Sequence, residues 1–339
     1  MRKTIIMTIL ITGGAGYIGS HTCLELLQAG FQIAVIDNLE NSSIDAIRKI
    51  EEYTGAKIWF YDGDIRNREK LNQIFTEHKI SAVIHFAAKK SITESVCNPL
   101  AYYDSNISGV ITLLKVMREY GCKNFLFSSS AAVYGIPECN PITEDMPAGC
   151  CTNAYARTKY MTEEILQDLV LSEPSWNVII LRYFNPIGAH PSGIIGELPK
   201  GTPQNLLPYV TQVAKGIREK VHVFGNDYPT CDGTGVRDYI HVVDLAQAHV
   251  QALRKLTGKT GVHIYNLGTG KGCSVLELIR IFEESNHVKV PYEICERRPG
   301  DVAEVYCDPS KAERELGWKA TLGIEDMCRD AWRWEKNNG

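Results

Sequence analysis

The chain has 339 residues, of which 44% are hydrophobic and 22% are charged, and its formal net charge is −4. This composition is ordinary for a globular protein with a large core, and the length suggests about two domains. The acidic balance argues against broad binding to nucleic acid or to an anionic membrane, since both need a basic face. A small phosphate ligand is still compatible, because a few local arginines or lysines are sufficient.

The N-terminal residues 4–12 form an apolar run that superficially resembles a secretion signal. The run is short and leads directly into a glycine-rich turn, so we interpret it as the first strand. No segment reaches the roughly 20 apolar residues of a membrane span. Eleven cysteines are scattered without a CxxC pair, and their odd count leaves one thiol over. Such a set is typical of reduced thiols and predicts a cytoplasmic protein without a metal site, with zinc as the poorer alternative.

Through the first half of the chain, β-branched apolar runs alternate with helical patterns. The predicted strands are 8–12, 32–37, 57–62, 82–86, 124–129 and 177–183, and the predicted helices are 17–29, 68–78, 99–120 and 153–171. Runs this apolar suit strands that are covered on both faces. Their alternation with helices implies right-handed crossovers. The sequence therefore predicts an α/β fold on a doubly wound parallel sheet.

The second half is richer in glycine and proline, which mark loops that can display ligand groups. The predicted elements there are a helix at 204–218, a strand and helix at 237–256, a strand at 263–266, a helix at 274–284 and a polar helical tail. No linker separates this half from the first. We therefore expect an interleaved arrangement, with a Rossmann domain of residues 1–184 plus about 235–266 and a smaller substrate lobe of about 185–234 and 267–339.

A glycine-rich loop at residues 12–19 follows the first predicted strand and opens the first helix. Gly13, Gly16 and Gly19 allow the backbone to approach a pyrophosphate, which the helix N-terminus can bind. Asp37 ends the second strand, where a carboxylate accepts hydrogen bonds from ribose hydroxyls, and no arginine follows it in the next four residues. The sequence therefore predicts NAD rather than NADP. The alternative is a plain strand–turn–helix loop.

Two further charged residues follow predicted strands, at the sheet edge where ligands gather in such folds. Asp64 follows the third strand and could meet the adenine, and Lys90 follows the fourth and could meet a phosphate. Either residue taken alone would more often be a solvated surface charge.

Tyr155 and Lys159 are spaced i, i+4 at the start of a helical pattern, so they share one helix face. A tyrosine phenol has an ordinary pKa of about 10, too high for a base at neutral pH. A nearby ammonium together with a positive nicotinamide ring would lower that pKa. A surface pair with this spacing is common by chance, but the dinucleotide loop and the strand-end serines 128–130 favour the catalytic interpretation. Ser130 would hydrogen-bond the reacting oxygen.

The order of the glycines, Ser130, Tyr155 and Lys159 resembles the extended short-chain dehydrogenase/reductase family. Longer strings resemble the UDP-glucose 4-epimerases within it: Gly-Tyr-Ile-Gly-Ser-His at 16–21, Ser-Ser-Ser-Ala at 128–131, Leu-Arg-Tyr-Phe-Asn-Pro at 181–186, Gly-Ala-His-Pro-Ser-Gly at 188–193, Phe-Gly-Asn-Asp-Tyr-Pro-Thr at 224–230 and Gly-Thr-Gly-Val-Arg-Asp-Tyr-Ile-His-Val at 233–242. The likeness runs from residue 8 to about residue 334.

The resemblance implies an isomerase that inverts C4 of a UDP-hexose with bound NAD. Tyr155 would remove the proton of the sugar 4-OH while a hydride passes from C4 to NAD. The 4-keto sugar would then turn and take the hydride back on its other face, with UDP binding energy anchoring the substrate. Lys159 would tune Tyr155 and hold the nicotinamide ribose. The resemblance also implies a homodimer through helices 99–120 and 153–171, which could equally serve the core alone.

The two binding sites are predicted as sets. The NAD set comprises Gly13, Gly16, Tyr17, Ile18, Gly19, Asp37, Asn38, Asp64, Ile65, Phe86, Ala87, Lys90, Asn106, Tyr155, Lys159 and Tyr183. The UDP-sugar set comprises Ser130, Tyr155, Asn185, Asn205, Leu206, Val223, Phe224, Arg237, Tyr239, Arg298, Asp301 and Val305. Arg237 and Arg298 suit a diphosphate because a guanidinium can bind two oxygens at once, although each alone would more often be a surface charge.

Three positions bear on reaction and substrate. Sugar 4,6-dehydratases of this family carry an Asp-Glu pair where this chain has Ala131 and Ala132, which can supply neither acid nor base. The epimerase pattern usually has threonine at position 132, so a lower rate or a shifted substrate preference is expected. Some bacterial UDP-glucose 4-epimerases have tyrosine where this chain has Val305, so we expect room for the N-acetyl group of UDP-GlcNAc and UDP-GalNAc.

Three alternative functions remain open. A dedicated UDP-N-acetylhexosamine 4-epimerase would follow if Ala132 and Val305 exclude the plain hexose. A non-enzymatic NAD-binding sensor on the same fold commonly lacks the tyrosine or lysine, and this chain has both. A net dehydrogenase would consume free NAD stoichiometrically.

Overall fold

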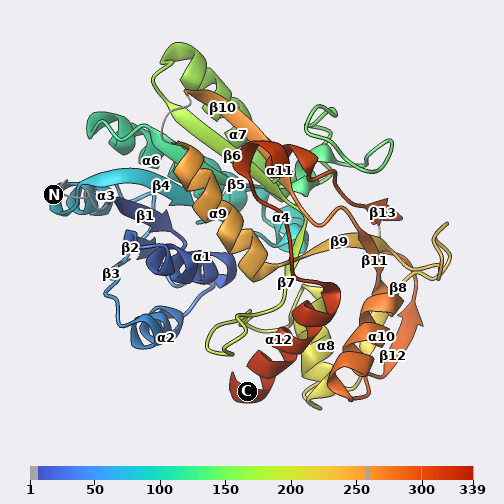
Figure 1. Cartoon of the computed structure of the whole chain (residues 1–339). Helices are drawn as coiled ribbons and strands as arrows, with labels where there is room; N and C mark the ends of the chain where they lie inside the picture. The colour runs from blue at the N-terminus through green and yellow to red at the C-terminus, as the bar shows by residue number, and fades with distance from the viewer. Residues whose placement is uncertain (1–6, 257–259, 299, 339) are drawn as a thin grey trace. The chain divides into compact units, whose positions relative to one another are not determined.

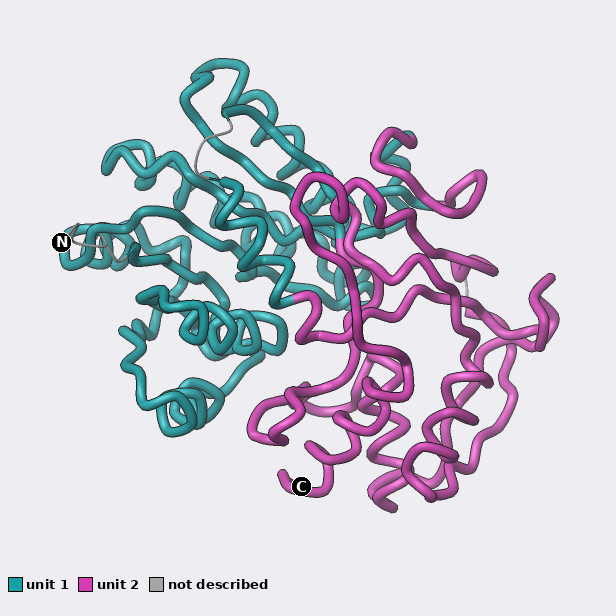
Figure 2. The backbone as a smooth tube through the Cα atoms, viewed as in Figure 1, with its two compact units in different colours: residues 1–135, 147–182, 246–265 teal, residues 136–146, 183–245, 266–339 magenta. Residues whose placement is uncertain are grey.

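The structure, a computed structural model, describes residues 7–256, 260–298 and 300–338 (Figure 1). The chain divides into two compact units, coloured separately in Figure 2. Residues 1–135, 147–182 and 246–265 form the first unit, and residues 136–146, 183–245 and 266–339 form the second. Among the described residues, no helix is long and apolar enough to cross a membrane.

A seven-stranded sheet is the centre of the first unit, in the order β10-β6-β5-β4-β1-β2-β3. Its strands are β1 (Thr8–Thr12), β2 (Gln32–Asp37), β3 (Trp59–Asp62), β4 (Ile80–His85), β5 (Asn124–Ser130), β6 (Asn177–Tyr183) and β10 (Gly261–Leu267). β1 pairs in parallel with both β2 and β4, and the pairs β2–β3 and β4–β5 are also parallel. The strand order thus runs outward from β1 in both directions, and the predicted fold class is confirmed.

The central strand β1 is buried at all five of its positions. It packs in a sheet whose faces are covered by helices, which is why the strand reads as a continuous apolar run. The order reverses between β1 and β4, and in open sheets of this kind ligands bind beyond the carboxyl ends of the strands at such a point. The glycine-rich loop follows β1 directly, so the fold places it at this position.

The helices of the first unit include two that the sequence did not predict, α2 and α4. The bounds are α1 (Tyr17–Gln28), α2 (Ile44–Thr54), α3 (Arg68–Glu77), α4 (Ile92–Cys97), α5 (Pro99–Tyr103), α6 (Gly109–Glu119) and α7 (Ala154–Ser172); α9 (Val242–Leu256) contributes to both units. The single helix predicted at 99–120 is interrupted by a π-helical turn at Asp104–Ser108. Such turns often occur at functional sites, and this one contains Asn106.

The second unit contains a four-stranded sheet and a two-stranded ribbon. In the first, β9 (Val236–His241) pairs with β7 (Asn185–Ile187), β11 (Gly272–Ser274) and β13 (Glu304–Val305); in the second, β8 (Val221–Phe224) pairs in parallel with β12 (Tyr292–Cys295). Its helices are α8 (Leu206–Ala214), α10 (Val275–Asn286), α11 (Ser310–Leu316) and α12 (Ile324–Asn338).

A buried carboxylate holds the centre of this second sheet. Asp238 on β9 is fully buried and accepts hydrogen bonds from the backbone N–H groups of Thr269, Gly270 and Cys307, at 2.7, 3.0 and 3.2 Å. Burial raises the pKa of this carboxyl group above its ordinary value. The hydrogen bonds offset the cost of burial and attach two loops to β9.

The observed units differ from the predicted domains near residue 235. The sequence predicts that residues 235–245 belong to the Rossmann domain. The strand concerned, β9, instead pairs with β7, β11 and β13, and residues 183–245 belong to the second unit. The assignment of NAD to one domain and of the UDP-sugar to the other stays a prediction.

Candidate functional site

The glycine-rich loop makes two close backbone approaches that only glycine permits. Gly13 has a φ of +72°, and a Cβ atom there would lie 2.7 Å from the backbone nitrogen of Ala87. A Cβ atom on Gly19 would lie 2.2 Å from the carbonyl oxygen of Gly13. Both distances are far below a normal contact, so the loop packs directly on the residues after β4 and on the first turn of α1.

Helix α1 begins after Gly16, and no side chain caps its N-terminus. Its first turn contains no acidic residue. The partial positive charge of this helix end is therefore not neutralised by a carboxylate of that turn, which suits a bound diphosphate. Tyr17 and Ile18 of the predicted NAD set are the first two residues of this helix.

Asp37 connects the end of β2 to the glycine-rich loop. The side chain is only 7% exposed and accepts hydrogen bonds from the N–H of Ala15 at 3.0 Å, the N–H of Leu39 at 2.9 Å and the hydroxyl of Ser42 at 2.7 Å. A carboxylate offers about four acceptor positions. Asp37 therefore orients the loop and retains capacity for a ribose hydroxyl.

Three predicted residues lie together at the ends of β2 and β3. The amide of Asn38 donates to the carboxylate of Asp64 at 3.2 Å. Arg66 donates to the same carboxylate at 2.7 and 2.9 Å and holds the pKa of Asp64 below its ordinary value. Ile65 between them is buried. Arg66, which the sequence analysis did not single out, thus fixes the Asp64 side chain.

The segment after β4 connects the loop to α7. The N–H groups of Phe86 and Ala87 donate to the carbonyl of Thr12 at 2.9 and 3.1 Å. Asn106 exchanges two hydrogen bonds with the backbone of Lys89 and donates a third, at 3.0 Å, to Thr158 on α7. These three hydrogen bonds connect the segment after β4 to α7 through Asn106. A contact of Asn106 with NAD stays a prediction. Lys90 belongs to the same segment.

Helix α7 positions the predicted catalytic pair. The side chain of Asn153 caps the helix by accepting from the N–H of Ala156 at 2.9 Å, so Tyr155 lies in the first turn and Lys159 one turn later. The ammonium of Lys159 donates to the carbonyl of Ser128 at 2.6 Å and lies 6.0 Å from the centre of the Tyr155 ring. Burial lowers the pKa of Lys159 to about 8, and the charge of Glu163 opposes that change.

The pKa of Tyr155 is raised, whereas the sequence predicts a lowered pKa. Burial raises the pKa of Tyr155, and a hydrogen bond with Ser130 lowers it by less. The pKa of Tyr155 was expected to fall because of two positive charges, that of Lys159 and that of the nicotinamide ring. The ring belongs to NAD, so the protein alone does not supply its charge. One reason is visible in the geometry: the ammonium of Lys159 is directed at the carbonyl of Ser128.

A buried ion pair behind Lys159 was missed by the sequence analysis. Glu163 on α7 is fully buried and accepts from Arg182 on β6 at 2.6 and 3.1 Å. The hydroxyl of Ser129 also donates to Glu163, and Arg182 donates to the hydroxyl of Tyr134 at 2.8 Å. The pair thus connects α7 to the ends of β5 and β6. A signal was present, since Glu163 lies at i+4 from Lys159 and Arg182 lies within an apolar strand.

The predicted UDP-sugar residues of the second unit form two groups. The pairing of β9 places Asn185 opposite Tyr239 and Val305 opposite Arg237. Arg237 donates to the carbonyls of Val236 and Val302 at 2.8 and 2.9 Å. The structure therefore brings the four paired residues together on one sheet.

The second group lies around β8. The guanidinium of Arg298 is 4.7 Å from the ring centre of Phe224, and it donates to Asp301 at 3.0 Å. Val223 is buried, so its side chain points into the core of the unit. Asn205, which precedes Leu206 at the start of α8, donates to Glu197 at 2.7 Å.

Comparison with known proteins identifies the family. Residues 10–331 match the family described as GDP-mannose 4,6 dehydratase. The UDP-glucose 4-epimerase of Bacillus subtilis is 57% identical over 332 residues, 98% of each chain, and that of Homo sapiens is 53% identical over 336 residues, 97% of each. The crystal structure of the Bifidobacterium longum UDP-glucose 4-epimerase in complex with NAD+ and UDP has a TM-score of 0.95 at 51% identity, covering 98% of this chain and 99% of that one. The chain belongs to the UDP-glucose 4-epimerase family.

The matched family description names a dehydratase, and the residues after Ser130 distinguish the two reactions. Ala131 and Ala132 begin a short 3₁₀ helix, and the N–H of Ala132 donates to the hydroxyl of Ser130 at 3.2 Å. Neither alanine can act as acid or base. This epimerase therefore lacks, at that position, the extra proton-transfer groups that elimination of water needs.

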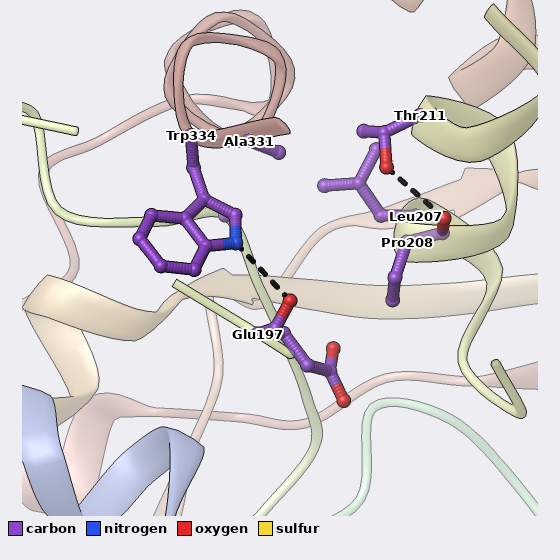
Figure 3. Close-up of a pocket in the computed structure, with 7 residues that line it drawn as sticks. Glu197, Leu207, Pro208, Thr211, Ala331 and Trp334 are labelled. Carbon is purple, nitrogen blue, oxygen red and sulfur yellow. Dashed lines mark hydrogen bonds between the residues drawn. The ribbon is translucent and has the colours of Figure 1, made fainter. Parts of the chain in front are cut away.

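A cavity in the second unit is separate from these residues (Figure 3). Its volume is about 10 Å³, which is roughly the space of one water molecule. Trp334 donates to the carbonyl of Glu197 at 3.2 Å across one side of it. The cavity is too small for a sugar nucleotide, and none of the predicted site residues lines it. Its lining residues are Gly188, Glu197, Leu207, Pro208, Thr211, Ala331 and Trp334.

Proposed function

We propose that this enzyme interconverts UDP-glucose and UDP-galactose by inverting C4 of the hexose, and that it retains NAD through the cycle. The observation that carries the proposal is the arrangement of Ser130, Tyr155 and Lys159 at the end of β5 and the start of α7. It occurs in a chain that is 57% identical to a UDP-glucose 4-epimerase. The reaction has two requirements. It needs residues that move a proton, and it needs a cofactor that accepts a hydride.

The residues of the first unit fit NAD. The close backbone packing at Gly13 and Gly19 forms a tight glycine-rich turn at the start of α1, α1 offers an uncapped N-terminus, and Asp37 retains acceptor capacity. When bound, NAD accepts a hydride from C4 and returns it, so that no net oxidation occurs. The position of Asp37 favours NAD, because its carboxylate would repel a 2′-phosphate.

The chain's own residues hold and move the proton of the sugar 4-OH. The phenol oxygen of Tyr155 takes that proton, and the hydroxyl of Ser130 hydrogen-bonds the same sugar oxygen. Lys159 is mostly protonated at neutral pH, given a pKa of about 8. Its positive charge stabilises the phenolate of Tyr155. After the sugar has turned and C4 has been reduced on its opposite face, the phenol returns the proton to the sugar oxygen O4.

The residues of the second unit hold UDP. Arg237 and Arg298 supply guanidinium groups for the diphosphate, while Asn185, Asn205 and Asp301 add polar groups around it. Strong binding of UDP leaves the sugar ring free to turn, because the binding energy is provided by the part that does not react. The absorbance of NADH tests the reaction type: added NAD should not be consumed in proportion to UDP-galactose, whereas stoichiometric NADH would indicate a net dehydrogenase.

The substrate range also includes UDP-GlcNAc and UDP-GalNAc in this proposal. Val305 has a small side chain and pairs in register with Arg237. A structural neighbour, the UDP-Glc/GlcNAc 4-epimerase from Campylobacter jejuni, has a TM-score of 0.84 at 36% identity over 98% of this chain and 99% of that one.

We expect Val305→Tyr to reduce kcat/KM for UDP-GlcNAc by about tenfold or more, because a bulky ring would fill the space of the N-acetyl group. Turnover of UDP-galactose should change far less, and Val302→Tyr provides the control for a bulky residue three positions away. Unchanged activity on UDP-GlcNAc would contradict the role of Val305. Activity on UDP-GlcNAc without activity on UDP-galactose would indicate the dedicated N-acetylhexosamine epimerase.

The proposed assembly is a homodimer through α5, α6 and α7, the helices expected at 99–120 and 153–171, together with the adjoining α4. Ile92, Val96 and Leu100 are spaced by four residues and are 52%, 65% and 79% exposed. A cluster of exposed aliphatic side chains is typical of a protein–protein interface. The proposed compartment is the cytoplasm, on the basis of the eleven scattered cysteines, all of which are free thiols in the structure.

A further inference from the structure

The ribbon formed by β8 and β12 in the second unit carries three metal-ligating side chains on one face. Its parallel register places Glu293 opposite His222 and Cys295 opposite Phe224. Because side chains alternate between the two faces of a strand, Glu293 and Cys295 point to the same side as His222. The three side chains are only partly buried, so solvent ions can reach them.

The ligand atoms of the three side chains lie close together. The Nδ1 atom of His222 is 2.7 Å from Oε1 of Glu293 and 3.6 Å from Sγ of Cys295, and all three atoms lie within 4.8 Å of one another. A tetrahedral zinc ion with ordinary Zn–S and Zn–N bonds holds its sulfur and nitrogen ligands about 3.6 Å apart. The His222–Cys295 separation therefore already matches, and the 2.7 Å between Nδ1 of His222 and Oε1 of Glu293 must lengthen by about 0.7 Å as the Glu293 side chain adjusts.

We propose that His222, Glu293 and Cys295 bind Zn²⁺ as three protein ligands, with the remaining position open to water or another small ligand. Imidazole and thiolate donors select zinc over magnesium or calcium, which prefer oxygen ligands alone. Within the described part of the chain this is the one group of at least three such residues at metal-binding separation. The sequence predicts no metal site, since its cysteines are scattered without a CxxC pair. Residues 222 and 295 are brought together only by the pairing of β8 with β12.

Lys220 provides a specific way to test the site. Its ammonium lies 2.5 Å from Oε2 of Glu293. A positive charge therefore competes with the metal for this carboxylate. Removing the charge of Lys220 should therefore tighten metal binding, up to about fivefold for a pair as exposed as this one.

The experiment uses the full-length enzyme with Co²⁺ as a spectroscopic probe and Zn²⁺ as the competitor. We expect one Co²⁺ per chain, a thiolate-to-cobalt charge-transfer band, and loss of that band when Zn²⁺ is added. Cys295→Ser should abolish the band and weaken zinc binding by about tenfold or more, and His222→Ala should weaken it similarly. Cys97→Ser, which changes an exposed cysteine of the first unit, is the matched control and should leave both measurements unchanged.

Several results would overturn the proposal. A charge-transfer band that persists in Cys295→Ser, or one that disappears in Cys97→Ser, would place the metal elsewhere. Absence of any band in the wild-type enzyme would remove the site altogether. An affinity for zinc that does not increase in Lys220→Ala would show that Glu293 is not a ligand. Melting temperatures of all variants verify that they are folded before metal is added.

Discussion

The ammonium of Lys159 is subject to two opposing influences. Burial disfavours its charged form and lowers its pKa to about 8, while the negative charge of Glu163 favours the charged form. The charged form predominates below that pH and is lost as the pH rises through it. Since Tyr155 needs a neighbouring positive charge to become a phenolate, we expect epimerase activity to fall on the alkaline side of pH 8.

Glu163→Gln should move that alkaline fall in activity to lower pH, because the change removes the charge that supports protonated Lys159. It should also destabilise the protein by about 3–5 kcal/mol, since Arg182 would be left buried without its partner. The measurements are kcat against pH and urea unfolding. Glu164→Gln, at the exposed neighbouring position, is the control and should change neither. A purely structural role of Glu163 would alter stability and leave the pH profile in place.

The sequence identifies Tyr155 and Lys159 because their chemistry and spacing are local. The Glu163–Arg182 pair was missed because it depends on two elements that meet only in the fold. Charged residues in buried positions nevertheless carry a signal, since they are rare in a core unless they are paired. The raised pKa of Tyr155 was also not predictable, because it depends on burial and on where the Lys159 ammonium points.

At the scale of secondary-structure elements, the junction between β1 and α1 is the proposed binding site of the NAD diphosphate. The loop, the first turn of α1 and the residues after β4 are packed so closely that added atoms must displace the backbone. A Cβ atom at Gly19 would meet the carbonyl oxygen of Gly13 at 2.2 Å and the Cα atom of Gly14 at 2.8 Å. This contact cannot be relieved by rotation of a side chain.

Gly19→Ala should therefore release NAD from the purified enzyme, because the backbone proposed to bind the diphosphate has to move. The nucleotide content after denaturation, measured by its ultraviolet absorbance, gives the result directly. Gly323→Ala is the control, since a Cβ atom there meets nothing closer than 3.8 Å. Full NAD content in Gly19→Ala would show that this close approach is not needed for cofactor binding.

Long elements with a strong apolar pattern were predictable, and short ones were not. The strands β1, β2 and β6 have the predicted bounds. In the second unit the six-residue β9 was predicted, whereas the other strands have only two to four residues, too few for a periodic pattern to be distinguished from a loop. The π-helical turn at Asp104–Ser108 is invisible for another reason: it replaces hydrogen bonds within an otherwise continuous helical pattern.

At the scale of the whole molecule, the sequence predicted an interleaved chain, and the exposed residues suggest how two copies associate. Ile92 and Val96 on α4 and Leu100 on α5 are exposed aliphatic residues. Burying this apolar surface against a second copy would remove it from water, which would favour association of the proposed dimer.

If the proposed homodimer forms through this region, Val96→Glu should convert it into a monomer at micromolar concentration, because dimerisation would bury an unpaired charge. Size-exclusion chromatography with light scattering gives the mass in solution. Ile217→Glu is the control, since it changes an aliphatic residue of the second unit that is 57% exposed. A wild-type enzyme that is already monomeric would contradict the proposed assembly.

The central claim, that this enzyme inverts C4 with retained NAD, is tested most directly by proton NMR. The purified enzyme is mixed with UDP-galactose without added nucleotide, and the anomeric signals are followed with time. We predict growth of the UDP-glucose signal to a constant ratio without accumulation of NADH, and no growth with Tyr155→Phe. An unchanged UDP-galactose spectrum after NAD has been supplied would contradict the claim.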